Sequence, residues 1–265
     1  MGTTWTDADI DARRAWVAAR REEGVEGVFR ATAAALPLPP SFHDALRVAR
    51  SARAVVAEVY RTDPGTGEAW DIEPAERVRQ LEALGASAIA MHVDEDRRGA
   101  SHTDLLAAAQ STSLPILCRD LILDPVQIVM ARSHGAAAVS LHAGVLSDRE
   151  LKALFREALD FGLDVMLEVT TARELDVASR LRRGSAESAA VRIIAVDACG
   201  EPSNWERLRA GIPEHAVAVA TGVCTPDHLA AAEAAGFDAF FVGGPLLCPD
   251  PTTAAATWLG DPIGI

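Results

Sequence analysis

The chain has 265 residues, 49% of them hydrophobic and 24% charged, so it can bury a large core without disulfide or metal staples. Its 25 basic and 38 acidic residues give a formal net charge of −13, which disfavours nucleic acid and anionic membrane surfaces as partners. Four widely spaced cysteines without a CxxC pair, and the absence of a leader segment or a long apolar run, predict a cytoplasmic protein with reduced thiols.

The N-terminal region predicts a helical extension that precedes the main body of the chain. Residues 8–34 carry apolar positions at helical spacing, which predicts one helix ending at the proline-rich stretch 36–40. A short further helix is expected after Ser41, whose hydroxyl is a suitable N-cap. We therefore expect a helical extension over residues 1–40 and a single domain over residues 41–265.

Eight short apolar or β-branched runs follow, and stretches with helical spacing separate them. The expected strands cover residues 54–60, 88–93, 114–118, 137–143, 164–169, 191–197, 216–221 and 239–242. The expected helices cover residues 74–84, 103–110, 125–133, 148–161, 172–182, 205–210 and 226–235. Several of these helices end in a glycine that suits a C-cap with positive φ, namely Gly85, Gly135, Gly162 and Gly236.

Strands that alternate with helices pair in parallel through right-handed crossovers, and eight such units fit a closed (β/α)₈ TIM barrel. The competing fold is an open doubly wound sheet, which usually has a GxGxxG turn after its first strand. Residues 60–67 lack that pattern, so the α/β barrel is preferred. In such a barrel the functional site lies at the carboxyl ends of the strands.

Short motifs in one order point to a known family. They include Ala57-Glu58-Val59, Gly99-Ala100-Ser101, Leu114-Pro115-Ile116-Leu117, Asp124-Pro125, Leu146-Ser147-Asp148, Leu167-Glu168-Val169, Thr225-Pro226-Asp227 and Val242-Gly243. Over residues 41–259 the chain resembles indole-3-glycerol phosphate synthase. The resemblance implies a phosphate-binding barrel that closes and decarboxylates an anthranilate-derived open-chain sugar phosphate into an indole. We expect no cofactor and no bound metal.

Two carboxylates of the family pattern are retained. Glu58 and Glu168 match the glutamates that end the first and fifth strands of the family. Two carboxyl groups that face one cleft can have their pKa values pushed apart, which provides an acid and a base. The alternative interpretation is a pair of solvated charges at strand ends.

Both lysines that the family uses for catalysis are replaced. Their positions hold Tyr60 and Arg119, and the only lysine of the chain, Lys152, lies in an expected helix. An arginine keeps its proton to a pKa above about 12, so Arg119 can neutralise an oxyanion or a carboxylate but is a poor proton donor. Tyr60 could donate a proton if neighbouring charge lowers its pKa, or it could be an aromatic wall of the pocket.

The phosphate-binding positions give conflicting signals. The family's Ser-Pro-Ser turn is replaced by Asp63-Pro64-Gly65, and a carboxylate facing a phosphate costs about 1 kcal/mol even in bulk water, so Asp63 disfavours phosphate unless it turns outward. Thr221-Gly222 and Gly243-Gly244 retain backbone donors where barrels commonly bind phosphate, although Pro245 removes one of them.

Other strand-end positions also depart from the family. Asp197 replaces an amide after the sixth strand, Asp94 keeps an acidic position after the second, and Arg97-Arg98 replace an aromatic pair. These arginines remove a stacking surface for an anthranilate ring and offer a site for a carboxylate.

Two histidines and two cysteines complete the expected mouth. His92 and His142 end the second and fourth expected strands and can act as acid or base near neutral pH. A metal site built from them is chemically feasible, but no HxH or HxxxH spacing supports it. Cys118 and Cys199 are interpreted as small apolar filler rather than nucleophiles.

We therefore expect a diverged enzyme that performs acid/base rearrangement, condensation or decarboxylation of a small carbonyl compound. Glu168 and Glu58 are the proton-handling pair, Arg119 is the anion clamp, and Tyr60 or His142 is a further donor. The alternatives are a genuine indole-3-glycerol phosphate synthase and a non-catalytic barrel that binds a metabolite or scaffolds a biosynthetic enzyme. The expected partner is a small-molecule substrate, and a homodimer or a biosynthetic partner enzyme is left open.

Overall fold

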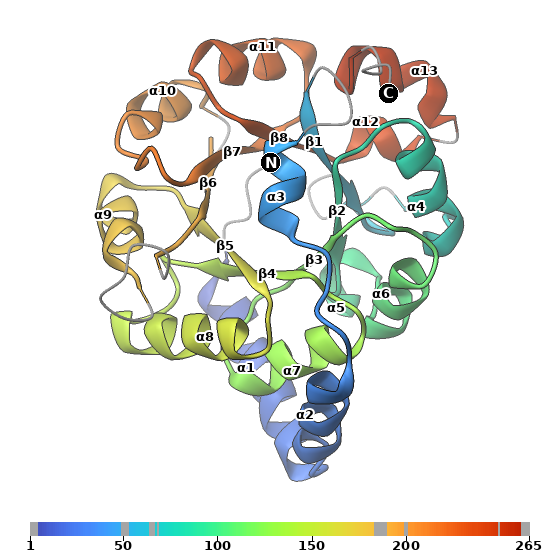
Figure 1. The fold of residues 1–265 in the computed structure, drawn as a ribbon, viewed down its shortest axis with the longest axis vertical. Helices are drawn as coiled ribbons and strands as arrows, with labels where there is room; N and C mark the ends of the chain where they lie inside the picture. The colour runs from blue at the N-terminus through green and yellow to red at the C-terminus, as the bar shows by residue number, and fades with distance from the viewer. Residues whose placement is uncertain are drawn as a thin grey trace.

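Eight parallel strands form a closed barrel at the centre of the molecule, and they pair in chain order until β8 meets β1 (Figure 1). The computed structural model describes residues 5–48, 53–63, 67, 69–182, 190–198, 201–248 and 250–260. The strands are β1 Ala54–Val59, β2 Ala88–His92, β3 Ile116–Arg119, β4 Ala138–His142, β5 Asp164–Val169, β6 Ile193–Asp197, β7 Val217–Val223 and β8 Ala239–Val242. This confirms the predicted (β/α)₈ barrel, and each strand lies within two residues of its expected bounds.

Helices surround the barrel and add an N-terminal extension. They are α1 Asp7–Glu22, α2 Glu26–Ala35, α3 Phe42–Arg47, α4 Pro74–Ala83, α5 Glu95–Arg98, α6 His102–Ala109, α7 Pro125–Ser133, α8 Asp148–Asp160, α9 Ala172–Arg180, α10 Ser203–Arg209, α11 Pro226–Ala234, α12 Gly244–Leu247 and α13 Pro251–Trp258. Ser101, Asp124 and Ser147 each start a helix with a reciprocal capping box. No helix in these ranges is both long and apolar enough to cross a membrane.

Side chains alternate along each strand between the barrel lumen and the surrounding helices. Val56, Ala90 and Leu117 belong to the lumen cluster, which also contains Met166 and Phe241. Their strand neighbours pack instead against the helices. Two residues further along β1, β2, β3 and β5, the same lumen-facing row becomes polar, so the barrel is a packed core whose carboxyl end carries the functional groups.

The N-terminal extension reaches both ends of the barrel. The predicted single helix over residues 8–34 is wrong, because Gly24 adopts a left-handed φ of 69° and divides it into α1 and α2. Helix α3, capped by Ser41 as expected, lies across the centre of the ring of strands in Figure 1. Its Phe42 and Leu46 join the lumen cluster and cover the end where the strands begin. Helices α5, α12 and α13 have no counterpart among the helices expected from the sequence.

Candidate active site

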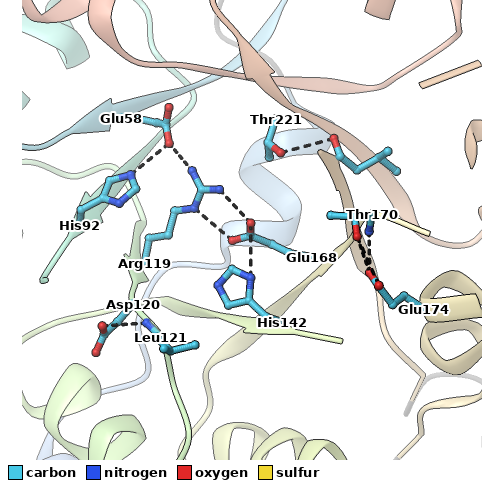
Figure 2. A network of polar contacts seen from close by, with 11 residues as sticks. Glu58, His92, Arg119, Asp120, Leu121, His142, Glu168, Thr170, Glu174 and Thr221 are labelled. Carbon is cyan, nitrogen blue, oxygen red and sulfur yellow. Dashed lines mark hydrogen bonds and ion pairs between the residues drawn. The ribbon is translucent and has the colours of Figure 1, made fainter. Parts of the chain in front are cut away.

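One network of charged and imidazole side chains joins the carboxyl ends of β1 to β5 (Figure 2). Arg119 on β3 lies between two glutamates. Its Nε and Nη2 donate to the two carboxylate oxygens of Glu168 at 3.0 and 2.8 Å, and its Nη1 donates to Glu58. His92 Nε2 lies 3.1 Å from Glu58 Oε1, and His142 Nδ1 lies 3.8 Å from Glu168 Oε2. The structure thus brings together five of the residues that the sequence singled out.

Both carboxylates of the network are held in the ionised form. Burial raises the pKa of Glu58, but the charge of Arg119 and the hydrogen bond with His92 bring it well below its usual range. Burial raises the pKa of Glu168, but the charge of Arg119, the charge of His142 and the hydrogen bonds from Arg119 together bring it below its usual value. Both pKa values are therefore lowered, because one guanidinium faces both groups.

The two histidines are neutral at neutral pH. Burial, followed by the charge of Arg98, lowers the pKa of His92 to about 4. Burial also lowers the pKa of His142, against the opposing charge of Glu168. His142 Nε2 is buried and has no hydrogen-bond partner among the described residues. A neutral imidazole with one nitrogen beside a carboxylate and the other unbonded can take up a proton from a substrate.

Tyr60 lies next to this network but keeps its proton. Its ring packs edge-on against Trp70 and His92, with centroids 5.4 Å apart in both pairs, and its hydroxyl donates to Asp63 Oδ2 at 3.4 Å. Burial and the negative charges of Glu58 and Asp63 raise the pKa of Tyr60. The condition for proton donation, a pKa lowered by neighbouring charge, is not met, so the phenol acts as a hydrogen-bond donor at neutral pH.

Glycines within β7 and after β8 allow close approach of the acidic side chains. A Cβ on Gly243 would lie 2.9 Å from both Glu58 Oε2 and the Tyr60 hydroxyl, and one on Gly244 would lie 3.9 Å from that hydroxyl. Gly222 has a positive φ of 78°, and a Cβ added to it would lie 3.4 Å from Asp197 Oδ1.

Two residues near the expected phosphate positions contact other parts of the protein. The hydroxyl of Thr221 donates to the Val196 carbonyl at 3.4 Å and is directed into the barrel wall. The charge of buried Asp197 acts on Arg119 from the β6 side. Pro64 and Gly65 lie outside the described residues.

Asp94 has a structural role that the sequence did not indicate. Its carboxylate accepts from the backbone N–H of Arg97 at 3.3 Å and so caps α5. It also pairs at 3.2 Å with Arg13 from α1, which pairs at 2.9 Å with Asp120. Arg13 therefore ties the N-terminal extension to the ends of β2 and β3.

Trp5 is a residue of the mouth that sequence reasoning missed. Its indole packs edge-on against His142 with centroids 5.6 Å apart, and the Arg97 guanidinium lies 4.6 Å from the indole centroid. Trp5 lines a narrow cleft together with His92, Arg98 and Arg119. The only local feature that could have indicated it was an aromatic side chain just before the N-cap Thr6. The contact between Trp5 and His142 joins residues more than half the chain apart, which local patterns do not predict.

Neither metal binding nor cysteine chemistry finds support in the parts of the chain that are described. Within them, no group of three or more histidine, cysteine or acidic side chains is placed to hold a metal ion. Cys118 is buried among the side chains that face the helices, and burial raises the pKa of its thiol well above the usual range. It is thus packing filler. Cys199 lies outside the described residues.

Comparisons with known proteins point to one family over nearly the whole chain. A family model described as indole-3-glycerol phosphate synthase matches residues 7–258. An indole-3-glycerol phosphate synthase of Rhodococcus jostii (strain RHA1) is 34% identical over 262 residues, which cover 96% of this chain and 94% of that protein. One of Chlorobium phaeovibrioides (strain DSM 265 / 1930) is 31% identical over 241 residues, with 90% and 93% covered.

Solved structures resemble the chain in fold. A structure described as native KDPGal matches with a TM-score of 0.56 and 18% identity, covering 77% of this chain and 91% of that chain. A designed cube-shaped, porous protein cage matches with the same TM-score and identity, covering 78% and 71%. Similarity at this identity shows the fold alone.

Proposed function

Because this chain belongs to the indole-3-glycerol phosphate synthase family, we propose that it is an enzyme of that family with a rebuilt barrel mouth. Its reaction is an acid/base rearrangement, condensation or decarboxylation of a small carbonyl compound, with arylamine-derived compounds as the expected class. The observation that carries the proposal is the Arg119 guanidinium held between the carboxylates of Glu58 and Glu168. At this position, and at that of Tyr60, the family resemblance expects a lysine.

Glu168 and His142 are the proposed proton-transfer pair. A carboxylate near Nδ1 favours the tautomer with hydrogen on that nitrogen, which leaves the lone pair of His142 Nε2 for a proton from the substrate. The imidazolium that forms is stabilised by Glu168 and returns the proton to a departing or carbonyl oxygen. This assignment requires ionised Glu168 and neutral His142, which agrees with the lowered pKa of each.

Arg119 is assigned two tasks. It orients both glutamates, and it stabilises negative charge that develops on a substrate oxygen. Burial opposes its charge, but Glu168 and Glu58 raise its pKa further, so it acts by charge and does not transfer a proton. Tyr60, with its hydroxyl already donating to Asp63, is a hydrogen-bond donor at the edge of the centre.

The altered phosphate corner supports a substrate other than the usual sugar phosphate. The Asp63 carboxylate accepts from the Tyr60 hydroxyl, which lies beside Gly243 and Gly244. A negative charge near these glycines repels a phosphate dianion. The competing candidate is the indole-forming reaction itself, and the identity to named synthases over nearly the whole chain favours it. In that reaction Arg119 would replace lysine electrostatically.

Incubation with the open-chain anthranilate sugar phosphate separates these two functions. We expect no indole fluorescence above a buffer blank from the wild-type protein. The Tyr60→Lys/Arg119→Lys double variant, which restores both ammonium groups, is the control expected to gain product. Indole formation by the wild type at a rate typical of enzymes would contradict the rebuilt-mouth proposal and establish the competing function.

The role of Glu168 is tested with whichever carbonyl substrate the wild type turns over. Glu168→Gln keeps the shape but removes the charge that stabilises the imidazolium, so kcat/KM is expected to fall by about 10² to 10⁴. Glu76→Gln, at an exposed position on α4, is the matched control and keeps full turnover. Equal kinetics for Glu168→Gln and wild type would remove Glu168 from the mechanism.

A further inference from the structure

Two unbonded hydrogen-bond donors lie at the barrel mouth, one from the N-terminal extension and one from α5. Trp5 Nε1 and Arg97 Nη1 are buried atoms, and neither has a hydrogen-bond partner within the described ranges. The ion pair of Arg97 with Asp9 is 3.7 Å long, which exceeds hydrogen-bond distance. An indole N–H and a guanidinium can donate but cannot accept, so both groups suit an acceptor and not a donor.

A second guanidinium lies on the same cleft. Arg98 lines it beside Trp5 and Arg97, and its guanidinium lies 4.8 Å from the centroid of the Tyr60 ring. No residue in the described part of the chain forms an ion pair with Arg98, although the more distant charge of Glu58 acts on it. This cation is therefore available to a bound anion.

The acidic residues of this cleft are paired with an arginine. Asp94 and Asp120 line it, and Arg13 pairs with both, at 3.2 and 2.9 Å. Two further carboxylates beside the cleft, those of Glu58 and Glu168, are paired with Arg119. The unpaired donors of Trp5, Arg97 and Arg98 can therefore contact a bound anion, because the carboxylates of the cleft are paired with other arginines.

We infer that Trp5, Arg97 and Arg98 form an oxyanion subsite that holds a carboxylate of the substrate. This inference rests on the proposed function, because the ligand is the compound on which the Glu168 centre acts. The Trp5 indole lies against His142, so a carboxylate bound here leaves the rest of the molecule beside the imidazole. Trp5, Arg97 and Arg98 thus determine specificity and do not transfer protons.

A carboxylate fits this subsite better than a phosphate. A carboxylate is planar and accepts two parallel N–H bonds from guanidinium groups. A phosphate dianion carries a second charge into a mouth that already holds Glu58, Glu168 and Asp63 as acidic neighbours, which disfavours it.

Benzoate binding to the full-length protein tests the subsite. Affinity is measured by calorimetry, and the indole N–H resonances of the five tryptophans are followed by NMR, with Trp5 identified through Trp5→Phe. We expect saturable binding that moves the Trp5 resonance. Arg97→Gln and Arg98→Gln each weaken binding at least tenfold, since each removes a charged donor. Arg14→Gln, at an exposed arginine of α1, leaves the affinity unchanged.

Two further ligands decide the chemistry of the subsite. Benzamide, which has the shape of benzoate without its charge, is expected to bind at least tenfold more weakly. Inorganic phosphate is expected to compete poorly, and stronger binding of phosphate than of benzoate would overturn the carboxylate assignment. A Trp5 resonance that does not respond, or equal benzoate affinity in Arg97→Gln, Arg98→Gln and wild type, would overturn the subsite.

Failure of the subsite and failure of the proposed function give different results. Glu168→Gln is expected to bind benzoate at least as tightly as the wild type, because it removes a negative charge that pairs with Arg119 of the same cleft. Bound benzoate without any turnover that depends on Glu168 would refute the proposed function alone. Turnover that depends on Glu168 without specific benzoate binding would refute the subsite alone.

Discussion

Arg119 is the residue on which the chemistry of the mouth depends. A buried cation is stable only when its hydrogen bonds and charge are matched, and here two glutamates provide both. Its guanidinium also lies 5.4 Å from the centroid of the Phe241 ring in the lumen. A lysine would offer one nitrogen and could not bridge the two carboxylates in the same way. The replacement therefore changes the geometry of the site as well as its proton chemistry.

Gly243 provides a test of how closely the network must pack. In Gly243→Ala the new Cβ would lie 2.9 Å from Glu58 Oε2 and from the Tyr60 hydroxyl, so both side chains must move. We expect kcat/KM to fall by about tenfold to a hundredfold. Gly27→Ala, whose Cβ meets nothing within 4 Å, is the control and keeps full activity. Steady-state kinetics on both variants checks this, and equal activity would show that Glu58 is not positioned by this contact.

At the scale of elements, the N-terminal extension is part of the fold. Helix α7 is buried over Val126 to Arg132, because α2 packs on its outer side. Arg132 donates to the carbonyls of Leu36, Pro37 and Phe161, which secures the segment between α2 and α3. The chain thereby passes from Trp5 of the extension at the mouth to Leu46 of α3 at the opposite end of the barrel.

The attachment of α1 to the barrel depends on the ion pairs of Arg13. Arg13→Ala leaves Asp94 and Asp120 buried without a counter-charge, which is expected to lower the free energy of unfolding by about 3–5 kcal/mol. Arg14→Ala removes an exposed arginine whose ion pair with Asp11 is 3.8 Å long, and is expected to change it by less than about 0.5 kcal/mol. Urea denaturation of both variants checks the difference, and equal midpoints would contradict it.

At the scale of the whole molecule, buried imidazoles couple folding to pH. His102 stacks on Trp16 of α1, with centroids 6.2 Å apart, and packs edge-on against His134 of α7. Burial, followed by the charges of His134, Arg13 and Arg20, lowers the pKa of His102 to about 3. The folded chain therefore keeps this imidazole neutral in a range where the unfolded chain protonates it.

This lowered pKa predicts a loss of stability in mild acid. Below the usual histidine pKa of 6.5 the unfolded state binds the proton and the folded state does not, so stability falls from pH 7 to pH 5. His102→Phe retains the ring stack and is expected to flatten this slope. His215→Phe, at an exposed histidine, is the control and keeps the wild-type slope. Thermal unfolding across this range checks it, and parallel slopes for His102→Phe and wild type would refute it.

The sequence alone determined the barrel and most of the residues at its mouth. Alternating and helical periodicities, caps such as Ser41 and the polar ends of strands are local, because side-chain directions are set within each element. His92 and His142 were predictable for that reason, and the family resemblance pointed to Glu58, Arg119 and Glu168 at the ends of their strands.

The tertiary structure decided how those residues behave. The two glutamates share one guanidinium, Tyr60 keeps its proton, and Trp5 and Arg13 reach the mouth from the other end of the chain. Ionisation and hydrogen-bond pairing depend on charges from distant segments, and these charges meet only when the strand ends converge and the extension folds over them.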